Sequence, residues 1–315
     1  MRTLLACLAL LLALAAPPAH AVSKKADGSD AAKEDAPLAD RAYADFQRGK
    51  FVAALAKAKE GAEKGEAASQ TLLGMLYHQG LGTTRDDAQA IYWYSQAAVQ
   101  GDREAQFSLG LMLARGEGTA KDEKKAAGWF EAAAAQGHIE AHYNLALMYV
   151  EGSAVERDFA KAAELLEFGA ERGHPESQYN LGVLYADGSG VEQSDEKAAY
   201  FIGLAAAQRL PAAEIEYALM VLRGRGVDKD EKKAQGLFRA AAERGNPIAQ
   251  NRLARMLAVG IGSDPDPIDA AKWHIIARTA GVSDGWLDGF LASLSPEQTA
   301  EANRRVKDYA APVQQ

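Results

Sequence analysis

The segment AAVQG at residues 97–101 recurs at a fixed distance along the chain, and this recurrence decides the fold. Each copy has two small residues, two variable residues and a final position that is glycine in all copies but one. These final positions are Gly65, Gly101, Gly137, Gly173, Arg209 and Gly245. They lie 36 residues apart, and Gly281 continues the series by one step. A fixed period of this length predicts a solenoid, in which each stacked unit contacts only its neighbours.

Six full repeats follow one another, and each has the sequence pattern of two helices. Their bounds are 67–102, 103–138, 139–174, 175–210, 211–246 and 247–282. In the second repeat, the first helix carries Leu109 beside Gly110, a large residue beside a very small one that lets a neighbouring helix approach closely. That helix ends at Gly116, which suits a left-handed C-terminal cap, and Gly118 follows. The pattern predicts an all-α fold, an α/α solenoid that forms a right-handed superhelix.

The second helix of each repeat begins at a good N-cap residue, such as Asp122, and continues through an alanine, such as Ala126. Three residues after this alanine comes a bulky side chain. The bulky positions are Trp93, Trp129, Leu165, Phe201, Leu237 and Trp273. Because apolar residues spaced i, i+3, i+4, i+7 share one helix face, we expect these side chains to be buried between helices.

Residues 1–21 have the pattern of a secretory signal peptide. Leu4–Ala16 is an apolar run of 13 residues, which is too short to span a bilayer. The following AHA at residues 19–21 has the small-x-small form of a cleavage site. We expect cleavage after Ala21 and a periplasmic or secreted mature protein. Since Cys7 is the only cysteine, that mature protein would contain no disulfide.

The segments that flank the repeats differ from them. Residues 22–37 are polar, charged and without aromatic residues, which predicts a flexible linker. Residues 38–66 have the pattern of a shorter, degenerate helical pair. At the other end, residues 283–315 predict capping helices, one of them apolar around Trp286 and the last opened by a capping-box pattern at residues 295–298. Terminal units of a solenoid need a polar outer face, which such atypical ends provide.

The charge balance and the loop motifs exclude several functions. The 315 residues include 35 Lys and Arg against 43 Asp and Glu, a formal net charge of −8, which gives no support to nucleic-acid binding. No apolar run after residue 21 reaches membrane length, so we expect no membrane insertion once the signal is cleaved. The G-x-G loops follow helices and lack the Lys-Ser/Thr pair of a phosphate site, so no cofactor is expected.

The second repeat carries the residues of a known family. The residues that resemble the Sel1-like repeat, a tetratricopeptide-like unit, are Leu109, Gly110, Gly116, Gly118, Asp122, Ala126, Trp129, Phe130, Ala133, Ala134 and Gly137. The resemblance extends over residues 67–282. It implies an α/α solenoid used for protein–protein contacts, often in the bacterial envelope or in signalling, and it implies no particular reaction.

We therefore expect a non-catalytic exported adaptor or scaffold that binds a protein partner, without a metal or a cofactor. Two alternatives stay open. Some periplasmic relatives hold a sensor kinase inactive, and a similar chain would be a negative regulator of such a kinase. The alternative of another class is a cell-wall enzyme or a carbohydrate-binding protein, although the sequence marks out no pair of residues as general acid and base.

A binding groove is predicted by analogy with tetratricopeptide packing, in which the first helices line the concave face. One groove position is aromatic in three successive repeats, with glutamates at its edge and an apolar residue at the neighbouring position. The predicted site comprises Phe107, Tyr143, Tyr179, Glu104, Glu140, Glu176, Leu111, Leu147 and Val183. Aromatic residues are favoured anchors for a peptide or helix, and rings in that role would be partly exposed. The alternative is that the rings are packing residues of the repeat.

His138 and His142 lie four residues apart, a spacing suited to two metal ligands on one helix face. A third ligand is not evident, however. Position 138 is also a repeat position, held elsewhere by Asp102, His174 and Asn246 just before a helix. We therefore expect His138 to cap the helix that follows it.

Overall fold

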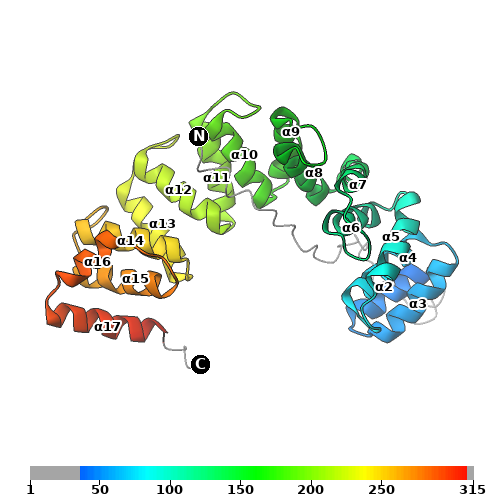
Figure 1. Cartoon of the computed structure of the whole chain (residues 1–315), viewed down its shortest axis with the longest axis horizontal. Coiled ribbons are helices and arrows are strands. Elements are labelled where there is room, and N and C mark those ends of the chain that lie inside the picture. Colours follow the sequence, from blue (N-terminus) through cyan, green and yellow to red (C-terminus); the bar gives the residue numbers. More distant parts are fainter. Residues whose placement is uncertain (1–35, 311–315) are drawn as a thin grey trace. The chain divides into compact units, whose positions relative to one another are not determined.

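The computed structural model describes residues 36–310, so the expected signal peptide and nearly all of the expected linker lie outside the described residues. Within this range the chain forms sixteen helices and no strand (Figure 1). They are α2 (Leu38–Gln47), α3 (Phe51–Glu63), α4 (Ala67–Gln79), α5 (Asp87–Val99), α6 (Arg103–Arg115), α7 (Glu123–Ala135), α8 (Ile139–Glu151), α9 (Phe159–Glu171), α10 (Pro175–Asp187), α11 (Asp195–Ala207), α12 (Pro211–Arg223), α13 (Glu231–Glu243), α14 (Pro247–Val259), α15 (Pro267–Thr279), α16 (Gly285–Ala292) and α17 (Pro296–Ala310). This confirms the predicted all-α helical-repeat solenoid.

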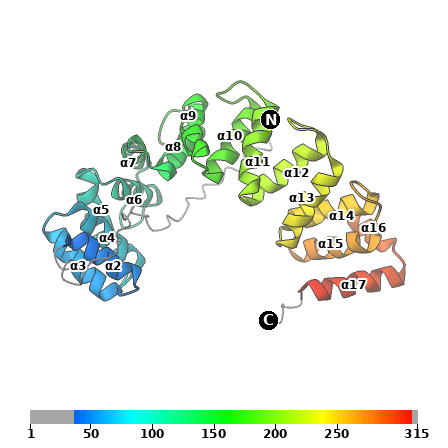
Figure 2. The ribbon, with the colours of Figure 1, turned by 180° about the vertical axis from the view of Figure 1, so that it is seen from behind.

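Contacts divide the chain into two compact units, one ending at Gly169 and the other beginning at Ala170. Helices that follow one another in the chain pack together from α2 to α8 in the first unit and from α10 to α16 in the second. At the end of the second unit, α17 packs along α15, as both views show (Figures 1 and 2). No helix within residues 36–310 combines the length and the hydropathy needed to cross a lipid bilayer.

The predicted helix caps are present. Each first helix ends at a glycine in the left-handed conformation, and these are Gly80, Gly116, Gly152, Gly188, Gly224 and Gly260. Each second helix has an N-cap side chain that accepts from the amide three residues later, as Asp122 does from Lys125 at 3.0 Å. Before α17, Ser295 and Gln298 form the predicted capping box, because each backbone amide donates to the other residue's side chain.

The large–small pair on the first helix brings the two helices of a repeat together, as predicted. A Cβ added to Gly110 would lie 2.7 Å from a ring carbon of Phe130. Likewise, a Cβ added to Gly74 would lie 2.9 Å from a ring carbon of Tyr94. The missing side chain therefore makes room for the ring of the neighbouring helix.

The buried position of the second helix is one residue later than predicted. The side chains four residues after the alanine are buried, and these are Tyr94, Phe130, Leu166, Ile202 and Phe238. Trp129 is only half-buried, as are its equivalents Trp93, Leu165, Phe201 and Leu237; Trp273 alone is buried as expected. The reason is that Ala126, Ala127 and Ala134 are also buried, which turns the buried face toward position i+4 and leaves Trp129 at its edge.

Pairs of glutamines, which the helix pattern does not reveal, link the two ends of a repeat to each other and bond to the preceding repeat. Gln106 Nε2 donates to the carbonyl oxygen of Ala98 at 3.2 Å, and its Oε1 accepts from Gln136 at 2.8 Å. Equivalent pairs join Gln70 to Gln100 and Gln178 to Gln208. In the fifth repeat an ion pair between Glu214 and Arg244 occupies the same two positions.

Arg209 is the only residue other than glycine with a positive φ among residues 36–310, at 65°. Its turn keeps the geometry of the glycine-ended turns, since the Arg209 amide donates to the Ala206 carbonyl at 2.9 Å and that of Gly245 to Ala242 at 3.0 Å. Arginine therefore adopts a backbone conformation that costs an L-residue roughly 1–2 kcal/mol.

We expect Arg209→Gly to raise the free energy of unfolding by about 1 kcal/mol, because the relief of this conformation exceeds the added freedom of glycine in the unfolded chain. Urea unfolding followed by circular dichroism measures the change. Arg209→Ala is the control, since it removes the charge and keeps the Cβ. An equal gain from alanine would show that the side chain, and not the backbone, is responsible.

Candidate functional site

The predicted groove rings differ in exposure. Phe107 and Tyr143 are buried, with 1% and 5% of their surface exposed, whereas Tyr179 is half-buried. The expectation that all three rings are partly exposed is therefore wrong for Phe107 and Tyr143. The Phe107 ring is covered because it stacks on His138 at 4.2 Å between centroids and meets Phe130 at 5.8 Å. Phe107 and Tyr143 therefore serve as packing residues of their repeats.

The three glutamates predicted at the groove edge lie beside histidines that precede helices. Glu104 Oε2 is 3.2 Å from His138 Nε2, and Glu140 Oε2 is 3.1 Å from His138 Nδ1. Glu176 Oε2 is 3.4 Å from His174 Nε2. The apolar residues predicted at the neighbouring position are buried, and these are Leu111, Leu147 and Val183. The structure thus brings these carboxylates together with capping histidines.

His138 caps α8, as predicted, because its Nδ1 accepts from the Ala141 amide at 3.3 Å. Burial opposes the charged form of this imidazole, but hydrogen bonds to Glu104 and Glu140 outweigh burial and raise the pKa of His138. Burial likewise opposes the charge of Glu104, and His138 overcomes it and lowers the pKa of that carboxyl. Nδ1 cannot accept from Ala141 and donate to Glu140 at once, so protonation exchanges the cap for an ion pair.

We expect the free energy of unfolding to fall as the pH rises from about 6.5 through the folded-state pKa of His138. A raised pKa contributes stability below the ordinary value of the group and loses it above the folded-state value. The control is His138→Asn, since asparagine does not titrate and caps the equivalent helix at Asn246. Urea unfolding at pH 6 and pH 8 gives the comparison. Equal pH dependence of the two proteins would contradict this role.

His142 does not join His138 in a metal site. Its ring stacks on Phe168 at 3.8 Å between centroids, and its Nδ1 lies 2.9 Å from the His138 carbonyl oxygen. Over the described range 36–310, no three His, Cys, Asp or Glu side chains converge as a metal site would need.

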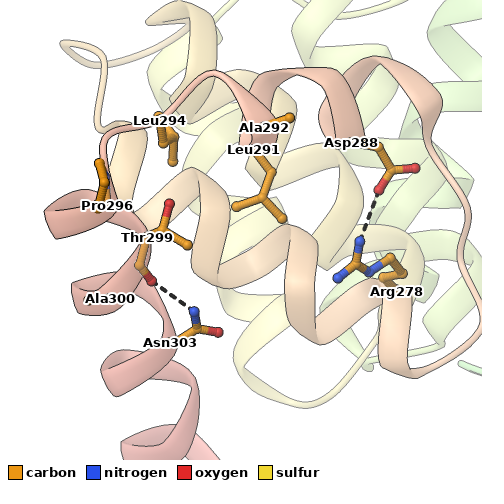
Figure 3. A pocket seen from close by; sticks show the side chains of 9 residues that line it. All are labelled: Arg278, Asp288, Leu291, Ala292, Leu294, Pro296, Thr299, Ala300 and Asn303. Atoms are coloured by element: carbon orange, nitrogen blue, oxygen red, sulfur yellow. Dashed lines mark hydrogen bonds and ion pairs between the residues drawn. The ribbon is translucent and has the colours of Figure 1, made fainter.

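A hollow of about 770 Å³ lies between α15, α16 and α17 (Figure 3). The two charged side chains in its lining pair with each other, because Arg278 Nη1 donates to Asp288 at 3.3 Å. The same carboxylate lies 2.8 Å from Nε2 of the buried His274. Asn303 donates to the Thr299 carbonyl oxygen at 2.9 Å. The lining therefore offers a ligand no uncompensated charge.

Helix α16 is held against the last repeat by Asp284. This carboxylate accepts two hydrogen bonds from Arg255, at 2.6 and 2.7 Å, and one from Asn251 at 2.9 Å. Hydrogen bonding to the Arg255 guanidinium holds the pKa of Asp284 well below its usual range. Asn251 and Arg255 lie 144 residues, or four repeats, after Phe107 and Leu111, so α16 is bound to the positions that would otherwise line the groove.

Beside this anchor lies a pocket of about 290 Å³ lined by residues of α12, α13, α14 and α16 and of the turn after α14. Phe238 and Met256 are buried in its wall, at 1% and 3% exposure. Val259 and Trp286 are about half exposed, at 52% and 48%. The charged residues in its lining are Arg223, Arg252 and Arg255. Leu219 and Arg255 are 36 residues apart, as are Arg223 and Val259, so part of the lining follows the repeat period. Sequence reasoning missed the pocket because Trp286, which completes it, comes from the non-periodic end of the array.

Comparisons with known proteins agree with the repeat pattern. A family model described as Sel1 repeat matches residues 67–102, 103–138, 139–174, 175–210, 211–246 and 247–282. The search of curated proteins gives no significant match. The crystal structure of c5321, a protective antigen of uropathogenic Escherichia coli strains with an SLR fold, is similar at a TM-score of 0.79 and 29% identity. That alignment covers 89% of this chain, which spans 63% of the antigen.

A second similar structure is a Sel1 repeat protein from Oxalobacter formigenes, with a TM-score of 0.69 and 26% identity over 79% of this chain and 100% of that one. Proteins built from Sel1 repeats generally mediate protein–protein interactions and typically serve as non-catalytic scaffolds. The six matched segments make up more than half of the residues. The chain therefore belongs to the Sel1 repeat family.

Proposed function

We propose that this chain is an exported, non-catalytic adaptor that binds a protein partner through the first helices of its repeats. The observation that carries the proposal is the open apolar pocket beside α12 and α14, the first helices of the fifth and sixth repeats. Trp286 and Val259 expose about half of their surface there, which costs hydration free energy that a bound partner would recover. Tryptophan is also among the residues most enriched at energetic hot spots.

The groove residues predicted from the sequence contribute to the first helices of their own repeats in different ways. Phe107 and Tyr143 are buried and so hold the helices in place without offering a contact area. Tyr179 keeps part of its ring surface accessible. The side chains of Glu140 and Glu176 are 43% and 37% exposed, and charges at such a rim affect the rate of association more than the affinity.

The proposal of export rests on the sequence pattern of residues 1–21, which is typical of a secretory signal peptide, and it predicts a mature chain in the periplasm or outside the cell. One candidate class of partner in the periplasm is the periplasmic domain of a sensor kinase. Negative regulation of such a kinase would be a specific form of the proposed protein-binding function. N-terminal sequencing of the exported protein checks the predicted cleavage after Ala21. Retention of the first 21 residues would contradict export by this route.

Site-specific photo-crosslinking in intact cells tests the binding function. A photoreactive amino acid replaces Trp286 in one variant and Tyr200 in the other; Tyr200 is 62% exposed on the second helix α11. We expect crosslinks to a discrete protein from position 286 and none from position 200. Mass spectrometry identifies the products as peptides or glycans.

The outcomes separate the alternatives. A protein adduct at position 286 alone supports an adaptor that uses the first-helix face. Equal crosslinking from both positions would contradict that face as the site. Adducts that carry only glycan fragments, or cleavage of purified cell-wall polymer by the mature chain, would overturn the proposal in favour of the cell-wall enzyme or carbohydrate-binding protein.

A further inference from the structure

The Trp286 pocket, defined as the cavity lined by Leu219, Leu222, Arg223, Phe238, Arg252, Arg255, Met256, Val259, Ile261 and Trp286, combines a small apolar volume with concentrated positive charge. Its volume of about 290 Å³ is at the small end of the range for ligand pockets, which suits one or two side chains better than a whole cofactor. The seven lining residues other than arginine are all apolar. An occupant must therefore offer an apolar group to the interior.

The three arginines of the Trp286 pocket are not equivalent. Arg255 is fixed by its two hydrogen bonds to Asp284, and its guanidinium lies 5.4 Å from the centroid of the Trp286 ring. Arg223 and Arg252 are exposed, and no carboxylate within residues 36–310 forms an ion pair with either of them. Two cations thus remain uncompensated beside the pocket on a chain whose formal net charge is −8.

Helix electrostatics explains only one of these cations. Arg223 is the last residue of α12, where a positive charge is stabilised by the negative end of the helix dipole. Arg252 lies in the second turn of α14, far from that end, and gains no such stabilisation. A carboxylate supplied by a partner would complement both guanidinium groups, because arginine binds carboxylates through two parallel hydrogen bonds.

We propose that the Trp286 pocket binds an acidic segment of a partner protein, with one apolar side chain inserted against Phe238 and Met256 and with flanking carboxylates on Arg223 and Arg252. This inference rests on the proposed protein-binding function and specifies its ligand. The aromatic wall supplies affinity and the unpaired arginines supply selectivity for negative charge. Nucleic acid fits less well, because the cations form one small cluster on an acidic chain and not a stripe that follows a backbone.

A peptide array presents the test probes. Each probe is a terminally blocked nine-residue peptide with a central leucine, phenylalanine, methionine or serine between pairs of glutamate or glutamine residues. We expect the chain of residues 22–315 to bind the probes that have both an apolar centre and glutamate flanks, measured by fluorescence polarisation. Exchange of the glutamates for glutamines, or of the apolar centre for serine, should each weaken binding about tenfold or more.

Paired variants show whether the site is the Trp286 pocket. Arg223→Gln combined with Arg252→Gln should weaken the acidic probes at least tenfold and flatten their salt dependence. The matched control combines Arg48→Gln with Arg209→Gln, which removes the same charge from exposed positions outside the pocket. We expect the control pair to bind like the unmodified chain. Circular dichroism melts check that each variant is folded.

Three results would overturn the inference. They are the absence of binding to every acidic apolar probe, equal weakening by the two pairs of variants, and binding of a single-stranded oligonucleotide that is equally sensitive to Arg223 and Arg252. Each of these would leave the adaptor function intact if position 286 still crosslinks to a protein in cells. If position 286 does not crosslink to a protein in cells but the acidic peptides still bind in vitro, the proposed function is contradicted and the inference about the pocket is not.

Discussion

Replacing Phe130 by alanine should lower the free energy of unfolding by about 3–5 kcal/mol, the range for a buried phenylalanine. Phe130 has no exposed surface, and its ring fills the space that Gly110 leaves on α6. It also contacts the buried ring of Phe107 at 5.8 Å between centroids. The substitution would therefore leave a cavity between α6 and α7, the two helices of the second repeat.

Trp129→Ala is the matched comparison for Phe130→Ala. Trp129 is larger than Phe130 but only half-buried, so we expect a smaller loss, about 1–2 kcal/mol. Urea unfolding followed by circular dichroism gives the two values, and hydrogen exchange of α6 and α7 shows whether the loss is local, as the stacking of repeats implies. A greater loss for Trp129→Ala would mean that the buried face is centred on position 129 after all.

Replacing Gly226 by alanine should be of comparable severity, with a loss of about 2–5 kcal/mol. Gly226 has a φ of 69°, which alone costs an L-residue roughly 1–2 kcal/mol. A Cβ at this position would also overlap the backbone carbonyl of Asp195, in the first turn of α11. Because the obstructing atoms are backbone, they cannot rotate away, and relief requires the loop to move off the preceding repeat.

Gly245→Ala separates the two contributions. Gly245 has a φ of 88°, and a Cβ there would meet no atom within 4 Å. We expect a loss of only about 1–2 kcal/mol from its backbone conformation. Thermal and urea unfolding of both variants provide the comparison. Equal losses at the two glycines would show that the approach of the loop to α11 contributes nothing to stability.

Local interactions explain why most of the fold follows from the sequence. The cap of α7 by Asp122 and the left-handed Gly116 depend on atoms within a few residues, and they recur every 36 positions. Because the same cap residues recur in each repeat, the prediction of each helix end is supported several times. The same argument identifies His138 as a cap, because Asp102 and Asn246 occupy its position in other repeats.

The sequence alone predicts the helix ends better than it predicts which side chains are buried and which are exposed. Trp129 and Phe130 are adjacent and both apolar, so the period alone does not distinguish the buried ring from the half-buried one. The choice depends on how α7 is rotated against Gly110 of α6, which is a property of packing. Likewise, the groove positions Phe107 and Tyr143 are buried by neighbours that lie in other segments of the chain, such as His138 over Phe107.

The repeat period, the helix pairs and their caps were determined by the sequence, whereas the candidate binding site was decided only by the tertiary structure. Arg255 and Asp284 are 29 residues apart, and Arg223 and Trp286 join the same pocket from α12 and α16. Arg223 and Arg255 lie within repeats, and Arg255 holds the repeat position of Leu111, whereas Asp284 and Trp286 lie beyond the last repeat. The pocket therefore forms where the periodic array meets its non-periodic end. A periodic pattern can reveal contacts that recur, but a contact made once must be found in space.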